Sequence, residues 1–90
     1  MGESMISEVK VKQLNEERYG TFAEAAELSQ QLKHIIMSGR SWGMLSPAKK
    51  EALDEIANRM SRVINGHPDE QRPWTEIRNY AELVLETNNV

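Results

Sequence analysis

The architecture of this chain is clearest in one segment, Arg59-Met60-Ser61-Arg62-Val63-Ile64-Asn65-Gly66, and in Trp74-Thr75-Glu76-Ile77-Arg78-Asn79-Tyr80-Ala81, which follows it after a polar connection. In both parts the apolar residues recur three or four positions apart, which is the spacing of one face of an α-helix. The segment therefore predicts the end of one amphipathic helix, a polar turn and the start of another. Most of the charged residues that packing does not explain also lie here.

Working outward, the pattern predicts four helices in one domain covering residues 1–90, at 5–18, 21–38, 47–65 and 73–87. Thr21 followed by Glu24 is a capping box, and Ser46-Pro47 places an N-cap before a proline at the first helical position. Gly66 suits the left-handed position that closes many helices. No segment alternates with the two-residue period of a half-buried strand. The fold class is therefore all-α, a small antiparallel bundle of three to four helices.

Each predicted helix has an apolar stripe that we expect to form the core. The expected core residues are Phe22, Ala25, Leu28, Leu32, Ile35 and Ile36 in the second helix, Leu53, Ile56, Ala57, Met60, Val63 and Ile64 in the third, and Trp74, Ile77, Tyr80, Ala81 and Val84 in the fourth.

Composition narrows the class of protein. The 90 residues are 39% hydrophobic and 28% charged, with a net charge of −3 and no cysteine. Disulfides, thiolate metal sites and a cysteine nucleophile are thereby excluded. No apolar run approaches the roughly 20 residues that span a bilayer, and the acidic balance argues against a nucleic-acid binder. We expect a soluble cytoplasmic protein whose thin core favours a homodimer or a protein partner.

A basic cluster is the first candidate site. Arg59 and Arg62 are three positions apart and share a helix face, so together they could bind an anion such as a phosphate or a nucleotide. His67, Arg72 and Glu76 lie close by in sequence. The alternative is a solvated helix end, where cations complement the negative end of the helix dipole.

Two acidic pairs form a second, alternative site. Glu24 with Glu27 and Glu51 with Asp54 are spaced three apart on neighbouring helices. Converging carboxylates of this kind hold Mg²⁺, and the pairs resemble those of the MazG-type nucleotide pyrophosphohydrolases. At about 100° per residue, however, Glu51 lies on the opposite side of its helix from the apolar stripe. Surface acids are therefore the competing interpretation, and no cofactor is expected unless Mg²⁺ binds here.

In the order of its motifs, the chain resembles a family of small phage and prophage proteins of unknown function. The resemblance implies a compact helical fold. The resemblance is carried by Arg18-Tyr19-Gly20-x-Phe22, by Ser61-Arg62-Val63-Ile64-Asn65-Gly66 and by Trp74-x-x-Ile77-x-x-Tyr80-Ala81. The chain is also distantly similar to MazG-like proteins. The resemblance implies that the protein works in the cytoplasm of a bacterial host.

The chain departs from that family in the basic cluster. The family has lysine where this chain has Arg59, aspartate where it has His67, and aspartate where it has Glu76. These changes favour a non-catalytic accessory protein that acts as a binding or protein-interaction module. The alternative is a Mg²⁺-dependent nucleotide-binding or pyrophosphohydrolase-like protein.

Overall fold

The computed structural model describes residues 10–11, 13–14, 19–66 and 68–87. They contain the helices α2 (Phe22–Met37), α3 (Pro47–Asn65) and α4 (Arg72–Thr87), and a short 3-10 helix, η1 (Trp42–Met44). No strand occurs among these residues, so the all-α prediction is confirmed. Of the predicted helix at 5–18, residues 10, 11, 13 and 14 are helical and the rest lies outside the described residues. None of the described helices is both long and apolar enough to cross a membrane.

Side chains define where α2 and α3 begin, as the sequence predicted. The Thr21 hydroxyl accepts a hydrogen bond from the Glu24 amide at 3.2 Å and donates one to Glu24 Oε1 at 2.9 Å. At the start of α3 the Ser46 hydroxyl accepts from the Lys49 amide at 3.2 Å, and Pro47 occupies the first turn. Each cap satisfies a backbone amide that the helix itself leaves unpaired.

The end of α3 differs from the prediction. Gly66 has φ −121° and ψ −153°, which is extended, so the expected left-handed closure at this position was wrong. Among the described glycines, the left-handed one is Gly20, with φ 75°. There Asn65 donates from Nδ2 to the Tyr19 carbonyl at 3.1 Å. The last residue of α3 is thus tied to the turn before α2, while Gly66 leads the chain away toward α4.

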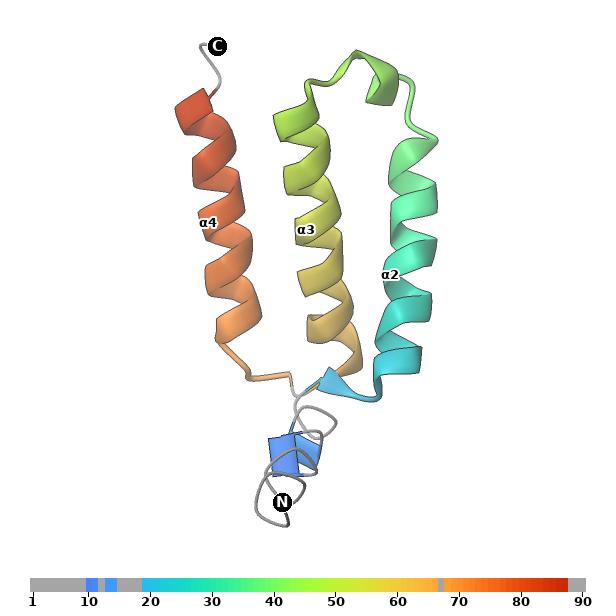
Figure 1. Cartoon of the computed structure of the whole chain (residues 1–90), viewed down its shortest axis with the longest axis vertical. Helices are drawn as coiled ribbons and strands as arrows, with labels where there is room; N and C mark the ends of the chain where they lie inside the picture. Colours follow the sequence, from blue (N-terminus) through green and yellow to red (C-terminus); the bar gives the residue numbers. More distant parts are fainter. Residues whose placement is uncertain (1–9, 12, 15–18, 67, 88–90) are drawn as a thin grey trace, which may run out of the picture.

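The three helices lie side by side in one layer, with α3 in the middle (Figure 1). Small residues fill the seam between α2 and α3: Ser29 and Ala57 are buried, and Ser29 Oγ donates to Asn58 Oδ1 at 2.6 Å. On the other side of α3, Ala52 and Pro73 are buried. Small side chains let the helix axes approach closely, so α3 contacts both neighbours along its length.

This layer buries much less than the predicted core. Among the described residues only Ala52 and Ala57 are buried hydrophobic side chains. Several residues that we expected inside are instead exposed. They are Phe22 (87%), Ile35 (66%), Ile64 (61%), Trp74 (51%), Met60 (39%) and Ala81. The reason is geometric: three helices in a row bury only their seams, whereas a closed bundle would also bury the stripe on each helix.

Candidate functional site

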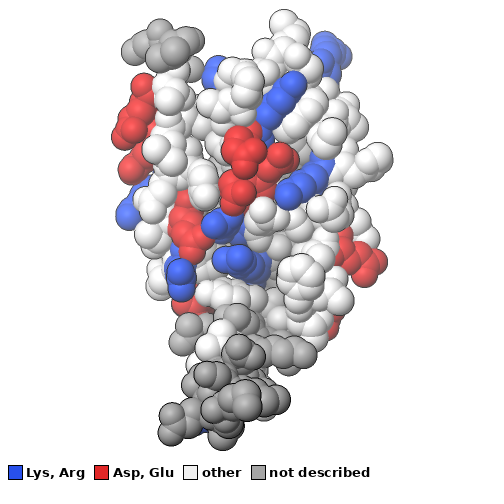
Figure 2. Space-filling view, viewed as in Figure 1, with Lys and Arg blue, Asp and Glu red and all other residues white. Residues whose placement is uncertain are grey.

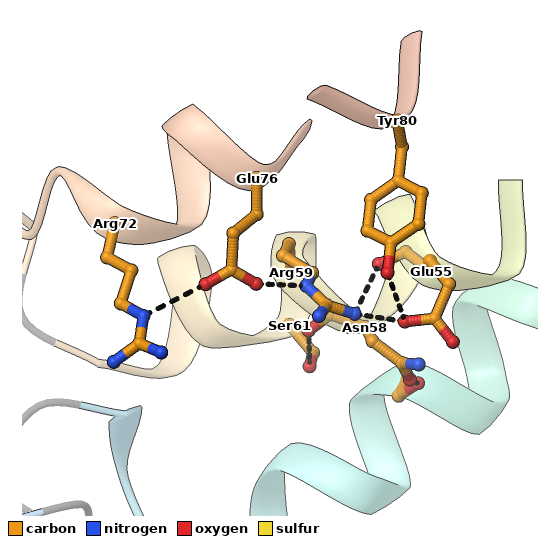
Figure 3. Close-up of polar contacts among 8 residues, drawn as sticks. Glu55, Asn58, Arg59, Ser61, Arg72, Glu76 and Tyr80 are labelled. Carbon is orange, nitrogen blue, oxygen red and sulfur yellow. Dashed lines mark hydrogen bonds and ion pairs between the residues drawn. The ribbon is translucent and has the colours of Figure 1, made fainter. Parts of the chain in front are cut away.

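Arg59 of α3 lies at the centre of a chain of charged contacts that joins α3 to α4 (Figure 3). Its Nε donates to Glu76 Oε2 at 2.6 Å. Its Nη1 donates to Glu55 Oε2 and, at 3.4 Å, to the Glu55 carbonyl. The Arg59 side chain is only 16% exposed, so these contacts are made largely away from water. One guanidinium therefore holds two carboxylates from two helices.

Two residues of α4 extend the cluster. Arg72 donates from Nε to Glu76 Oε1 at 3.1 Å, and its own side chain is 72% exposed. The Tyr80 ring lies under the Arg59 guanidinium, 5.1 Å from ring centroid to Cζ, and its hydroxyl donates to Glu55 Oε2 at 3.5 Å. We call Glu55, Arg59, Arg72, Glu76 and Tyr80 the ion cluster. Its two cations and two carboxylates cancel in formal charge.

The protonation states follow from these contacts. Burial alone would raise the pKa of Glu76, but the hydrogen bond and positive charge of Arg59, with further help from Arg62 and Arg72, lower that pKa below its ordinary value. Burial likewise opposes the charge on Arg59, yet the hydrogen bonds to Glu76 and Glu55 raise the pKa of Arg59. Both groups are therefore held in their charged forms.

The structure brings together some, but not all, of the predicted anion-binding residues. Arg59, Arg72 and Glu76 meet in the ion cluster, while the Arg62 guanidinium lies 5.3 Å from the centroid of the Tyr19 ring. His67 lies outside the described residues. Glu76 and Glu55 already accept from Nε and Nη1 of Arg59, so an incoming phosphate would compete with two carboxylates for this guanidinium. Anion binding at this cluster stays a prediction.

Sequence reasoning missed two members of the cluster. Glu55 is four residues before Arg59, a spacing that favours an ion pair on one helix face and could have identified it. Tyr80 was expected only as a core residue, and its contact with Arg59 depends on how α4 lies against α3.

The alternative Mg²⁺ site does not assemble. Within the described part of the chain, no three His, Cys, Asp or Glu side chains lie close enough to hold a metal ion. Glu24 caps α2, and Glu27 accepts a hydrogen bond from Gln31 at 3.5 Å on the same helix. Glu51 is exposed and Asp54 half-buried on α3. Glu24, Glu27, Glu51 and Asp54 therefore do not form the converging carboxylate set that Mg²⁺ requires.

The second notable feature is a set of exposed apolar side chains from all three helices. We call it the apolar face, and define it as Ile35 of α2, Met60 and Ile64 of α3, and Trp74 and Leu85 of α4. The pairs Ser29–Asn58 and Arg59–Glu76 show which faces of the helices meet at the two seams. Counted from these residues at about 100° per residue, all five side chains fall on the same side of the layer. Ile56 and Leu53 of α3 lie half-buried beneath them.

The ion cluster lies toward the other side of the layer. Trp74 and Glu76 on α4 point about 160° apart, as do Met60 and Arg62 on α3. Figure 2 shows Lys, Arg, Asp and Glu side chains gathered along the middle of that charged side, over α3. The charged side also has two exposed apolar side chains, Met37 (55%) and Leu83 (51%), each about 160° from an apolar-face residue of its own helix. The ion cluster and the five residues of the apolar face therefore lie on opposite sides of the layer.

Comparison with known proteins adds no assignment, because no family model, curated protein or solved structure matches this chain.

Proposed function

We propose that this chain is a non-catalytic protein-interaction module, of the accessory kind that its resemblance to phage and prophage proteins implies. Its binding surface is the apolar face, and the ion cluster serves to hold α4 in place beside α3. Its site of action is the cytoplasm of a bacterial host.

The observation that carries this proposal is the exposure of five large apolar side chains on one side of the layer. Leu85 is 70% exposed, Ile35 66%, Ile64 61%, Trp74 51% and Met60 39%. Soluble monomers rarely present such groups together, and a large contiguous apolar patch marks an interaction site. Trp and Met are also among the residues enriched in protein interfaces. The chemistry of this surface favours an apolar protein partner.

The charged side of the layer gives weaker support for a binding site than the apolar face does. Within the ion cluster the cations and carboxylates neutralise one another, so the cluster itself lacks the unbalanced charge that attracts a phosphate or a metal ion. The acidic residues of the alternative site are dispersed over α2 and α3. We therefore favour binding over nucleotide chemistry.

Photo-crosslinking in bacterial cells tests the proposal. Trp74 is replaced by benzoylphenylalanine, and a matched variant carries it at Asn79, an exposed position about 140° away on the same helix. We expect a discrete protein adduct, identified by mass spectrometry, from position 74 and none from position 79. No adduct from either position, or equal adducts from both, would contradict the proposal.

A further inference from the structure

We infer that the partner covering the apolar face is a second copy of this chain, so that two three-helix layers stack into a homodimer. The inference rests on the proposed function in one respect, the use of this face as the binding surface. What it adds is the identity of the occupant.

The exposed area is the first argument. The five side chains of the apolar face are between 39% and 70% exposed and come from all three helices. A standard interface buries ~800 Å² on each partner. A contact that covers the whole width of the layer can therefore bury every one of these side chains.

The second argument is the thin core. With Ala52 and Ala57 as the only buried hydrophobic side chains in the described part, the layer has little apolar burial of its own to oppose the entropy of folding. Further burial would come from a partner that is present whenever the chain folds. A second copy meets that condition, because it is made at the same place and in the same amount.

The charge pattern is compatible with a second copy. Each chain has a net charge of −3, so two copies repel unless their charges point away from the contact. Between Leu53 and Ile64, the charged residues of α3 all lie off the apolar stripe: Asp54, Glu55, Arg59 and Arg62. Along this stretch two apolar faces can therefore meet without placing like charges opposite one another, while the ion cluster of each copy remains on the outer side. Lys49 and Lys50, in the first turn of α3, do point toward the apolar face, within about 20° of Met60 and about 40° of Ile64 respectively, so they would lie at one end of the contact.

The arrangement that follows is a two-layer, six-helix dimer. A two-fold contact uses the same patch on both copies. Because α3 is the middle helix of the layer, a two-fold axis through the centre of the face sets α3 against the partner's α3. Met60 then lies near the axis, and Ile35, Trp74 and Leu85 are covered at the sides. Such stacking produces the continuous core that a single layer lacks.

Sedimentation equilibrium on the purified chain tests the oligomeric state. We expect twice the 10.3 kDa chain mass for the wild type. Met60→Asp should shift the protein toward the monomer, because it would bury two carboxylates against each other. Glu51→Gln is the matched control on the charged side of α3 and should remain dimeric. A wild type that stays monomeric and folded at high micromolar concentration would overturn the inference.

Cysteine crosslinking locates the interface even if Met60→Asp fails to fold. The chain has no cysteine, so Met60→Cys and Glu51→Cys each introduce a single thiol. With a flexible bismaleimide we expect a covalent dimer from Met60→Cys and little from Glu51→Cys.

The two proposals fail in different ways. A folded monomer that still crosslinks from position 74 to another protein removes the second copy and retains the interaction module. A dimer that crosslinks only through Glu51→Cys places the interface on the charged side, and overturns both.

Discussion

Arg59 holds two half-buried carboxylates that would otherwise repel one another, so its removal should be costly. We expect Arg59→Ala to lower the free energy of unfolding by about 1–3 kcal/mol, since it leaves Glu55 and Glu76 without their shared cation. Urea unfolding followed by circular dichroism measures the loss.

Arg72→Ala is the matched control. Arg72 also pairs with Glu76, but its side chain is 72% exposed, and exposed pairs contribute little. We expect a change of no more than about 0.5 kcal/mol. Equal losses for the two variants would mean that Arg59 is no more structural than a surface arginine.

Glu76 should make stability depend on pH. Its pKa in the folded protein lies below the ordinary 4.5, so the unfolded chain takes up this proton more readily. The contribution of Glu76 is therefore fully present above the unfolded pKa and is lost as pH falls through the folded pKa. We expect the stability advantage of wild type over Glu76→Gln to shrink between about pH 6 and pH 3. An advantage that stays constant over this range would contradict the assignment.

The predicted phosphate site can be tested at the same residues. Arg59 already donates to two carboxylates, so millimolar ATP, with or without Mg²⁺, should leave the amide resonances from Arg59 to Tyr80 unshifted. Shifts concentrated on Arg59, Arg62 and Arg72 would restore the nucleotide-binding alternative. NMR titration makes the measurement, with NaCl at equal ionic strength as the control.

At the scale of helices and turns, Gly20 is a tightly constrained position. With φ 75°, its backbone is unfavourable for any residue with a side chain, and an added Cβ would lie 2.6 Å from the Asn65 carbonyl oxygen. We expect Gly20→Ala to destabilise the protein by at least about 1–2 kcal/mol, the cost of the left-handed conformation alone. Gly43→Ala, where a Cβ meets nothing within 4 Å, should be nearly neutral. Thermal melts of the two variants compare them directly.

Helix boundaries were the part of the fold that local sequence could predict. The caps at Thr21 and Ser46 involve residues three apart, so the information needed lies within one turn. The left-handed closure predicted at Gly66 was wrong, because a glycine after a helix permits this conformation without requiring it. The hydrogen bond from Ser29 to Asn58 was not foreseen, since it depends on the register between α2 and α3.

For the candidate site, the sequence predicted several of the residues but not the contacts between them. Arg59, Arg72 and Glu76 were singled out because packing did not account for them, and the structure places them in contact. Their pairing with one another was not predicted, because helix spacing alone does not position α4 against α3. Periodicity likewise identified the apolar stripes of Met60, Ile64 and Trp74, but it could not tell whether another helix covers them.

For the whole molecule, the proposed dimer links folding to concentration. If only the paired layers are stable, mass action raises the melting temperature as protein concentration rises. We expect an upward shift over about a hundredfold range of concentration for wild type and for Glu51→Gln. Any Met60→Asp protein that folds should melt independently of concentration. A wild-type melting temperature that does not change with concentration would argue against obligate pairing.

The layered order of α2, α3 and α4 also has a kinetic consequence. Each helix packs on the helix next to it in sequence, so the main contacts close short loops and the contact order is low. Helical proteins with such local contacts fold within about microseconds to milliseconds. The contacts of a single layer can therefore form quickly and transiently before dilute chains meet, and pairing then stabilises them. Newly made chains would pass through an interval with Trp74 and Leu85 uncovered, which is when chaperones or aggregation would compete with assembly.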